Sequence, residues 1–373
     1  MTIVFYTSGH GFGHASRDLE IINAIGNRAP RSRVLIRTKV PPWFLEVSRR
    51  VPLETQSVDT DPGVVQDGSL AIDELQTAQA ASGFYSTFPA RVHREVEALR
   101  QLGATLVVGD IPPLAFAAAA DAGLPSIALG NFTWDWIYHA YPRFEEMAPG
   151  VLSQIGEAYA RAGRVLRLPF HGGFETMRAP IEDLPLVARR ARRDRDDTRR
   201  LLSLDRAGLV VLASFGGHQV SLPLSAIGRQ RRFSVLVTDH EVPDAPETGS
   251  SPSVRWFRRG DLTALGIRYE DLVAASDVVV AKLGYGIVSE CIANGAALLY
   301  TSRGRFPEQE VFVAELPRVL RCRFIAQDDL RDGRWLEGVE AVVAQPEPPA
   351  RMRADGAEKA AQAMLDVLDE LSP

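Results

Sequence analysis

The stretch Ala281 to Glu290, AKLGYGIVSE, joins an apolar run typical of a buried parallel strand to a run with the periodicity of an amphipathic helix. Gly284 and Gly286 stand in the turn between them. Glycine has no Cβ, so the backbone can turn sharply and approach an anion, and the N–H groups that open the next helix carry partial positive charge. Glu290 follows about one turn into that helix, where its carboxylate can accept from ribose hydroxyls. The stretch therefore predicts a site for a nucleoside diphosphate.

A second turn of this kind lies near the start of the chain. The apolar run Thr2 to Thr7 predicts a first strand, and a helix is expected from about Ala15 to Ile25. Between them stands SGHGFGH, which places two histidines, His10 and His14, in a glycine-rich turn with Gly11 and Gly13. Because open α/β folds bind ligands at the carboxyl ends of their strands, this turn is expected to line a site.

Two further strands end in polar residues. The run ATLVVG, residues 104–109, ends at Asp110, and LPSIAL, residues 124–129, leads into Asn131 and Trp134. The carboxyl ends of parallel strands share one edge of a sheet, so these side chains are expected beside the His10/His14 turn. A strand at 208–214 likewise runs into Phe215-Gly216-Gly217-His218.

Length and composition limit the class of protein. The 373 residues exceed a single hydrophobic core, which favours two domains, and 42 Lys and Arg against 47 Asp and Glu disfavour a nucleic-acid partner. No run is long enough to span a membrane, and the N-terminus reads as a strand without the basic region of a signal peptide. With only two cysteines, Cys291 and Cys322, a cytoplasmic location is expected.

A run of mixed charge at 184–202 marks the expected domain boundary. Asp194, Asp196 and Asp197 interrupt its arginines, which favours a solvated linker with a surface helix. The predicted parts are an acceptor-side domain at 1–185, a donor-binding domain at 186–355, and a terminal helix at 356–373 that is expected to pack back on the first domain. The pair Asp59 and Asp61 has the spacing of a metal motif, but turn chemistry beside Pro62 explains it better, so no metal is expected.

The order of these motifs resembles that of GT-B nucleotide-sugar glycosyltransferases. SGHGFGHASR, residues 8–17, is similar to the glycosyltransferase-like region that precedes the kinase domain in plant L-arabinokinases. AKLGYGIVSE, followed by SRGRFPEQ at 302–309, is similar to the donor-binding segment of the group that includes the N-acetylglucosaminyltransferase making lipid II. The resemblance implies an α/β fold of two Rossmann-like, doubly wound domains that face a cleft.

The resemblance also implies roles for particular residues. His14 would be the base that deprotonates the acceptor, Asp110 would orient it, and His10 is a second catalytic candidate. Acceptor-side contacts are expected from Gly11, Gly13, Asn131 and Trp134. The donor, most simply a UDP-sugar, would contact Gly216, Gly217, His218, Phe257, Lys282, Gly284, Tyr285, Gly286, Ile287, Glu290, Arg303, Glu308 and Gln309. The expected reaction inverts the anomeric carbon and uses no cofactor or obligatory metal, and the acceptor stays unidentified.

Three alternatives to a transferase remain at this point. A nucleotide-sugar epimerase would use the same donor site without an acceptor, and a non-catalytic module would keep the donor pocket without turnover. A dinucleotide enzyme is disfavoured because Gly9-x-Gly11-x-Gly13 departs from the G-x-G-x-x-G spacing. Arg37 and Lys39 also stand near the place where such an enzyme carries an acidic residue.

Overall fold

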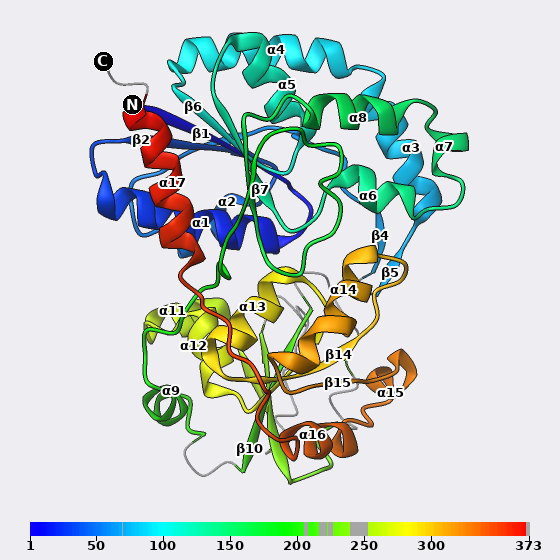
Figure 1. The fold of residues 1–373 in the computed structure, drawn as a ribbon. Coiled ribbons are helices and arrows are strands. Elements are labelled where there is room, and N and C mark those ends of the chain that lie inside the picture. The colour runs from blue at the N-terminus through cyan, green and yellow to red at the C-terminus, as the bar shows by residue number, and fades with distance from the viewer. Residues whose placement is uncertain (69, 205–207, 216–221, 223–226, 239–252, 371–373) are drawn as a thin grey trace.

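The protein consists of two α/β lobes stacked on one another in a computed structural model (Figure 1). The structure describes residues 1–373 apart from 69, 205–207, 216–221, 223–226, 239–252 and 371–373. Each lobe is built on a parallel sheet, which confirms the predicted fold class of two Rossmann-like domains.

The first lobe has a seven-stranded parallel sheet in the order β3-β2-β1-β6-β7-β8-β9. Its strands are β1 (Thr2–Thr7), β2 (Arg33–Thr38), β3 (Glu54–Ser57), β6 (Leu106–Asp110), β7 (Ser126–Gly130), β8 (Arg164–Arg167) and β9 (Ile181–Asp183). Its helices are α1 (Phe12–Arg28), α2 (Pro42–Ser48), α3 (Glu74–Tyr85), α4 (Phe88–Leu102), α5 (Pro113–Ala122), α6 (Trp134–His139), α7 (Phe144–Met147) and α8 (Val151–Tyr159). Crossover helices on both faces explain why β1, β6 and β7 are almost wholly buried.

The second lobe has a six-stranded parallel sheet in the order β12-β11-β10-β13-β14-β15. Its strands are β10 (Leu209–Ser214), β11 (Phe233–Thr238), β12 (Val254–Phe257), β13 (Val278–Lys282), β14 (Ala297–Thr301) and β15 (Cys322–Phe324). The helices around it are α9 (Arg195–Leu201), α11 (Arg259–Ala264), α12 (Tyr269–Ala275), α13 (Tyr285–Asn294), α14 (Pro307–Glu315), α15 (Gln327–Arg331) and α16 (Leu336–Val343). A 3₁₀ turn, η1 (Leu316–Arg318), follows α14.

The carboxyl ends of the central strands of both sheets point toward the junction of the lobes. In the first sheet Thr7 pairs in register with Asp110, and in the second Ala281 pairs with Ser214. The turns that follow β1 and β13 therefore meet: a Cβ built on Gly286 would come within 3.3 Å of the Gly13 Cα. Glycine at these two positions permits the close approach of the two backbones.

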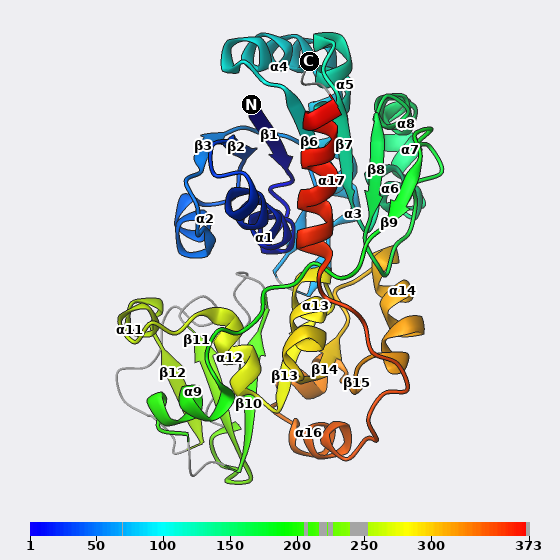
Figure 2. The same cartoon turned by 60° about the vertical axis from the view of Figure 1, so that its left-hand side comes forward.

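The chain returns to the first lobe at its end. Helix α17 (Gly356–Glu370) runs beside α1 in both views, at the red end of the ribbon (Figures 1 and 2). The N–H of Gly356 donates to the carbonyl of Leu186 at 3.0 Å, and Met364 shares a buried cluster with Leu19 and Ile22 of α1. Helix α17 follows the prolines at 348 and 349 and begins at Gly356.

A small hairpin crosses from the first lobe to the second. It consists of β4 (Gln66–Asp67) and β5 (Ala71–Ile72), which pair antiparallel. Leu70 at its tip is buried among side chains of the second sheet, and the Leu70 carbonyl accepts from Gln327 Nε2 at 2.9 Å. The hairpin therefore ties the two lobes together beside the cleft.

Other differences from the predicted elements are local. The segment from 74 to 102 forms two helices, α3 and α4, which are separated at Ser86 and Thr87 because Pro89 opens a new helix. The predictions also lacked the edge strands β3, β8, β9 and β15, which are short and lack a long apolar run. None of the helices among the described residues has the length and apolarity needed to cross a membrane.

Candidate functional site

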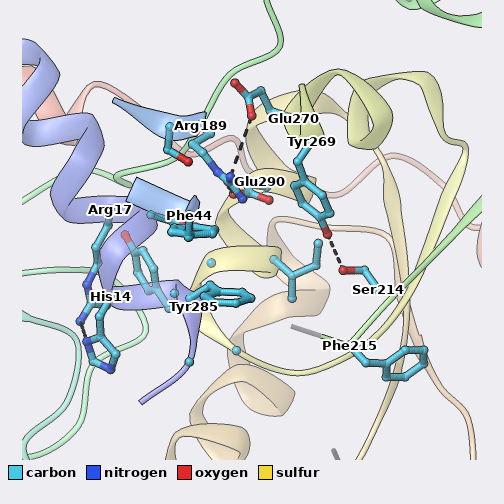
Figure 3. Close-up of a pocket in the computed structure, with 18 of the residues that line it drawn as sticks. His14, Arg17, Phe44, Arg189, Ser214, Phe215, Tyr269, Glu270, Tyr285 and Glu290 are labelled. Carbon is cyan, nitrogen blue, oxygen red and sulfur yellow. Dashed lines mark hydrogen bonds and ion pairs between the residues drawn. The ribbon is translucent and has the colours of Figure 1, made fainter. Parts of the chain in front are cut away.

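A cavity of about 490 Å³ lies between the lobes (Figure 3). The first lobe lines it with the turn after β1, with α1 and α2, and with the end of β7. The second lobe lines it with the turn after β13, with α11 to α13, and with the loop after β14. Most of the predicted site residues line it: His10, Gly11, Gly13, His14, Asn131, Lys282, Gly284, Tyr285, Gly286, Ile287, Glu290, Arg303 and Glu308.

His14 stands in the first turn of α1 with a carboxylate behind it. Its Nδ1 lies 3.1 Å from Asp110 Oδ1, and Asp110 is fully buried at the end of β6. Arg17, one helical turn after His14, reaches the same carboxylate through Nε at 2.6 Å and Nη2 at 2.5 Å. Arg17 Nη1 also donates to Asn131 Oδ1 at 2.7 Å, so one guanidinium joins the ends of β6 and β7.

Neighbouring charges determine whether Asp110 is ionised. Burial alone would raise the pKa of Asp110, but the charges of Arg17 and His14 outweigh it, and the pKa falls to about 2. Asp110 is therefore ionised at neutral pH. The neighbouring Asp18 is also buried, and burial together with the Asp110 charge raises its pKa well above the ordinary range. Asp18 accepts from Thr7 Oγ1 at 2.5 Å.

The second lobe closes the far side of this cluster. Glu308 Oε1 accepts from Asn131 Nδ2 at 2.7 Å, and Glu308 Oε2 accepts from Arg303 Nη2 at 2.6 Å. Arg303 lies over the Phe306 ring at 3.8 Å. Thus Glu308, which the resemblance assigns to the donor sugar, uses Oε1 for an interdomain contact and Oε2 for an ion pair within the second lobe.

His10 belongs to a chain of polar contacts that spans the lobes. Gln66 Oε1 accepts from Lys282 Nζ at 3.0 Å, and Gln66 Nε2 lies 3.3 Å from His10 Nε2. An amide nitrogen only donates, so His10 Nε2 is the acceptor and a neutral His10 carries its proton on Nδ1. The ring of His10 stacks on Phe306 and meets Trp134 edge on.

Asp61 lies close to the same aromatic rings. Trp134 Nε1 and Ser8 Oγ each donate to it at 3.0 Å. Burial raises the pKa of Asp61 to about 6, although the charge of His14 and these hydrogen bonds oppose the rise. Asp59 is instead exposed and faces Arg91. Within the described part of the chain, no three His, Cys, Asp or Glu side chains are placed to hold a metal ion.

The turn after β13 has the predicted form of strand, glycine turn and helix. Gly284 is the N-cap of α13, no side chain caps the helix, and Lys282 and Arg303 also line the cavity there. Tyr285 turns its ring under the Arg17 guanidinium at 5.0 Å, and its hydroxyl accepts from the Val187 N–H at 3.1 Å. The free N–H groups of the first helical turn and two cationic side chains make this end of the cavity suitable for a phosphate.

Glu290 lies deeper along the same wall, against an arginine of the linker. Arg189 Nε donates to Glu290 Oε1 at 2.6 Å, and Arg189 Nη1 lies 4.0 Å from Glu270 Oε2 (Figure 3). Burial raises the pKa of Glu290 to about 7 against the attraction of Arg189. Beside them, the hydroxyls of Tyr269 and Ser214 share a hydrogen bond of 2.5 Å.

Some predicted residues lie elsewhere. Asp110 and Trp134 are buried behind the residues that line the cavity, and Gln309 accepts from the Arg303 N–H at 3.2 Å. Phe257 ends β12 and packs against the core cluster, while Arg259 and Leu262 after it line the cavity. Gly216, Gly217 and His218 fall outside the described residues.

Four polar residues that organise the site were not predicted from the sequence: Arg17, Asp61, Gln66 and Arg189. Arg17 had a usable signal, because residues three apart share a helix face and His14 was already a candidate. Arg189 had none, since it stands in a charge run that otherwise reads as solvated.

The comparisons with known proteins agree with this architecture. No protein-family model matches the chain. L-arabinokinase from Arabidopsis thaliana is 30% identical over 352 residues, which cover 92% of this chain and 32% of that protein. The chain therefore spans about a third of the length of this relative, and the homology confirms the resemblance noted in the sequence.

Solved glycosyltransferase structures match the whole fold. The glycotransferase of kitacinnamycin has a TM-score of 0.63 at 17% identity, covering 100% of this chain and 99% of the other. UGT2 from Phytolacca americana, complexed with UDP-2-fluoroglucose and pterostilbene, has a TM-score of 0.58 at 13% identity, covering 99% and 94%. VinC in complex with dTDP has a TM-score of 0.55 at 16% identity, covering 100% and 98%. The chain thus has the GT-B fold of glycosyltransferases.

Proposed function

We propose that this protein transfers a sugar from a nucleoside-diphosphate sugar to an acceptor hydroxyl. One observation carries the proposal: a single interdomain cavity holds a histidine backed by an ionised carboxylate on one wall and an uncapped helix N-terminus on the other. A base and a site for a leaving diphosphate are the two parts that such a transfer requires.

The donor is expected on the second lobe. Its diphosphate would lie on the N–H groups of Gly286 and Ile287 at the start of α13, with Lys282 and Arg303 as counter-charges. The leaving diphosphate gains negative charge as the glycosidic bond breaks, so these groups stabilise the transition state more than the ground state. They supply the positive charge without an obligatory metal.

His14 is the proposed base. Asp110 holds its Nδ1 side, which leaves Nε2 to take the acceptor proton. The acceptor oxygen then forms its bond to the anomeric carbon as the bond to the diphosphate breaks on the opposite face. Direct displacement of this kind inverts the configuration of the anomeric carbon. Gly11, Gly13 and Asn131 would border the acceptor, and His10 is the second catalytic candidate. Trp134 lies buried behind these acceptor-side residues.

We take UDP as the expected nucleotide and dTDP as its competitor, because UGT2 and VinC were solved with a UDP-sugar and with dTDP. The test is a thermal-shift titration with UDP, dTDP, GDP, ADP and NAD, each with and without chelator. A ligand that binds only the folded protein raises its melting temperature. A response to UDP or dTDP that survives chelation supports the proposal, whereas a response to NAD alone contradicts it.

Product analysis separates transfer from the alternatives. Incubation with the responding nucleotide sugar and a panel of acceptors should yield a glycoside of inverted configuration. A new nucleotide sugar formed without an acceptor would instead indicate an epimerase, and tight binding without any product would indicate a non-catalytic module.

A further inference from the structure

Arg189 belongs to the linker between the lobes, yet it lies inside the nucleotide cavity. Its Nε donates to Glu290 Oε1 at 2.6 Å, and the two side chains are 11% and 3% exposed. At this degree of burial either charged group would be costly to bury alone, so each side chain keeps the other in place. The pair joins residues 101 positions apart in the chain.

Aromatic rings from both lobes surround the guanidinium. Its Cζ lies 5.0 Å from the centre of the Tyr269 ring in α12 and 5.8 Å from that of Phe44 in α2. Phe44 stacks in turn on Phe12 at the start of α1. Arg189, a linker residue, therefore contacts side chains of both lobes at one point (Figure 3).

Other charged groups face this point, and most have cations of their own. Glu20 of α1 accepts from both Nη atoms of Arg50 at 2.8 Å. Glu270 lies 3.9 Å from Arg268, in addition to its 4.0 Å contact with Arg189. For Glu290, the cation in direct contact among the described residues is Arg189. Glu20 and Glu270 both add negative charge near Glu290, so its ionisation depends on Arg189.

We propose that Arg189 is a positioning residue of the donor site: it holds the Glu290 carboxylate ionised and oriented toward the nucleoside sugar, so nucleotide binding depends on the linker. The inference rests on the proposed function, because it assigns Glu290 to the nucleotide. An ionised carboxylate accepts hydroxyl hydrogen bonds more strongly than a carboxylic acid, so nucleotide affinity should follow the ionisation of Glu290.

The test is calorimetric titration with UDP and dTDP from pH 6 to pH 9 in wild type, Arg189→Met, Arg189→Lys and Glu290→Gln. Burial raises the pKa of Glu290 to about 7, so wild-type affinity should rise as the pH increases through 7. Without Arg189 the ionisation should move up by one pH unit or more, which at pH 7.5 weakens binding roughly three- to tenfold. Arg189→Lys should restore most of the wild-type profile, and Glu290→Gln should bind weakly with little pH dependence.

Arg190→Met is the matched control, because Arg190 is the neighbouring, exposed arginine. It should titrate like wild type. Equal affinity and an equal pH profile in Arg189→Met and wild type would overturn the positioning role while leaving the proposed function intact. If wild type binds neither nucleotide at any pH, both proposals fall. Should Arg189→Met not fold, Arg189→Lys together with Glu290→Gln decides: a pH-dependent Glu290→Gln would exclude Glu290 as the group that titrates.

Discussion

Replacing Arg17 with methionine should destabilise the protein strongly, because it leaves Asp110 charged and buried without its main partner. In the wild type the pKa of Asp110 falls from 3.8 to about 2. A shift of that size corresponds to about 2.5 kcal/mol of folding free energy at neutral pH. The folded-state pKa is the lower one, so this stability is complete above about pH 4 to 5 and is lost as the pH falls toward 2. Breaking a buried ion pair from one side typically costs about 3–5 kcal/mol, and we expect that range for Arg17→Met.

The assay is urea unfolding at pH 7, followed by tryptophan fluorescence and by circular dichroism. Coincidence of the two transitions is the condition for converting them to one free energy. Adding Asp110→Asn to Arg17→Met should recover part of the loss, because the unpaired charge is then gone. In the Arg17→Met single variant, burial raises the pKa of Asp110 without opposition from Arg17. The stability of that variant should therefore rise as the pH falls from 7 toward 5.

The control is Arg143→Met, which removes an exposed arginine paired with Glu146 and should leave the midpoint unchanged. The reasoning is refuted if Arg17→Met is as stable as wild type. It is also refuted if adding Asp110→Asn costs as much in the variant as in the wild type, since two coupled charges cannot behave additively.

Three further predictions follow from the site and the hairpin. His14→Ala should lower the rate of transfer by about 10²- to 10⁴-fold while leaving nucleotide affinity nearly unchanged. Substitution of the exposed His139 by alanine is the control. Full activity of His14→Ala would exclude His14 as the base. Gln66→Leu removes the donor to the His10 Nε2. ¹⁵N NMR of that ring should report a proton on Nδ1 in wild type and on Nε2 in the variant. An identical tautomer in both proteins would contradict the hydrogen bond. Leu70→Ala leaves a cavity where the hairpin packs against the second lobe, so the free energy of unfolding should fall by about 2–4 kcal/mol. The radius of gyration in small-angle X-ray scattering should increase. Unchanged dimensions and stability would show that the hairpin does not tie the lobes.

Much of the fold could be predicted because its elements are local in sequence. The segment Thr2–Thr7 has the same bounds in the structure as in the prediction, and the strand predicted at 208–214 is β10 (Leu209–Ser214). Apolar runs that end in glycine turns and precede helical periodicity are typical of parallel sheets, so the position of the sheet edge that lines the cavity followed from the same patterns. His14, Asn131 and Glu290 line one cavity for that reason, and Asp110 lies behind His14.

The hydrogen bonds and ion pairs that connect the residues of the site could not be predicted. Arg17 and Asp110 are 93 positions apart, Arg189 and Glu290 are 101 apart, and Lys282 and Gln66 are 216 apart. No periodicity encodes such pairs, because a charged side chain has the same local pattern whether it ends in water or against a buried carboxylate. The sequence by itself determined the two sheets and the edge at which they meet. Only the tertiary structure decided which cation neutralises which acid, because that choice depends on how the two lobes and their linker pack.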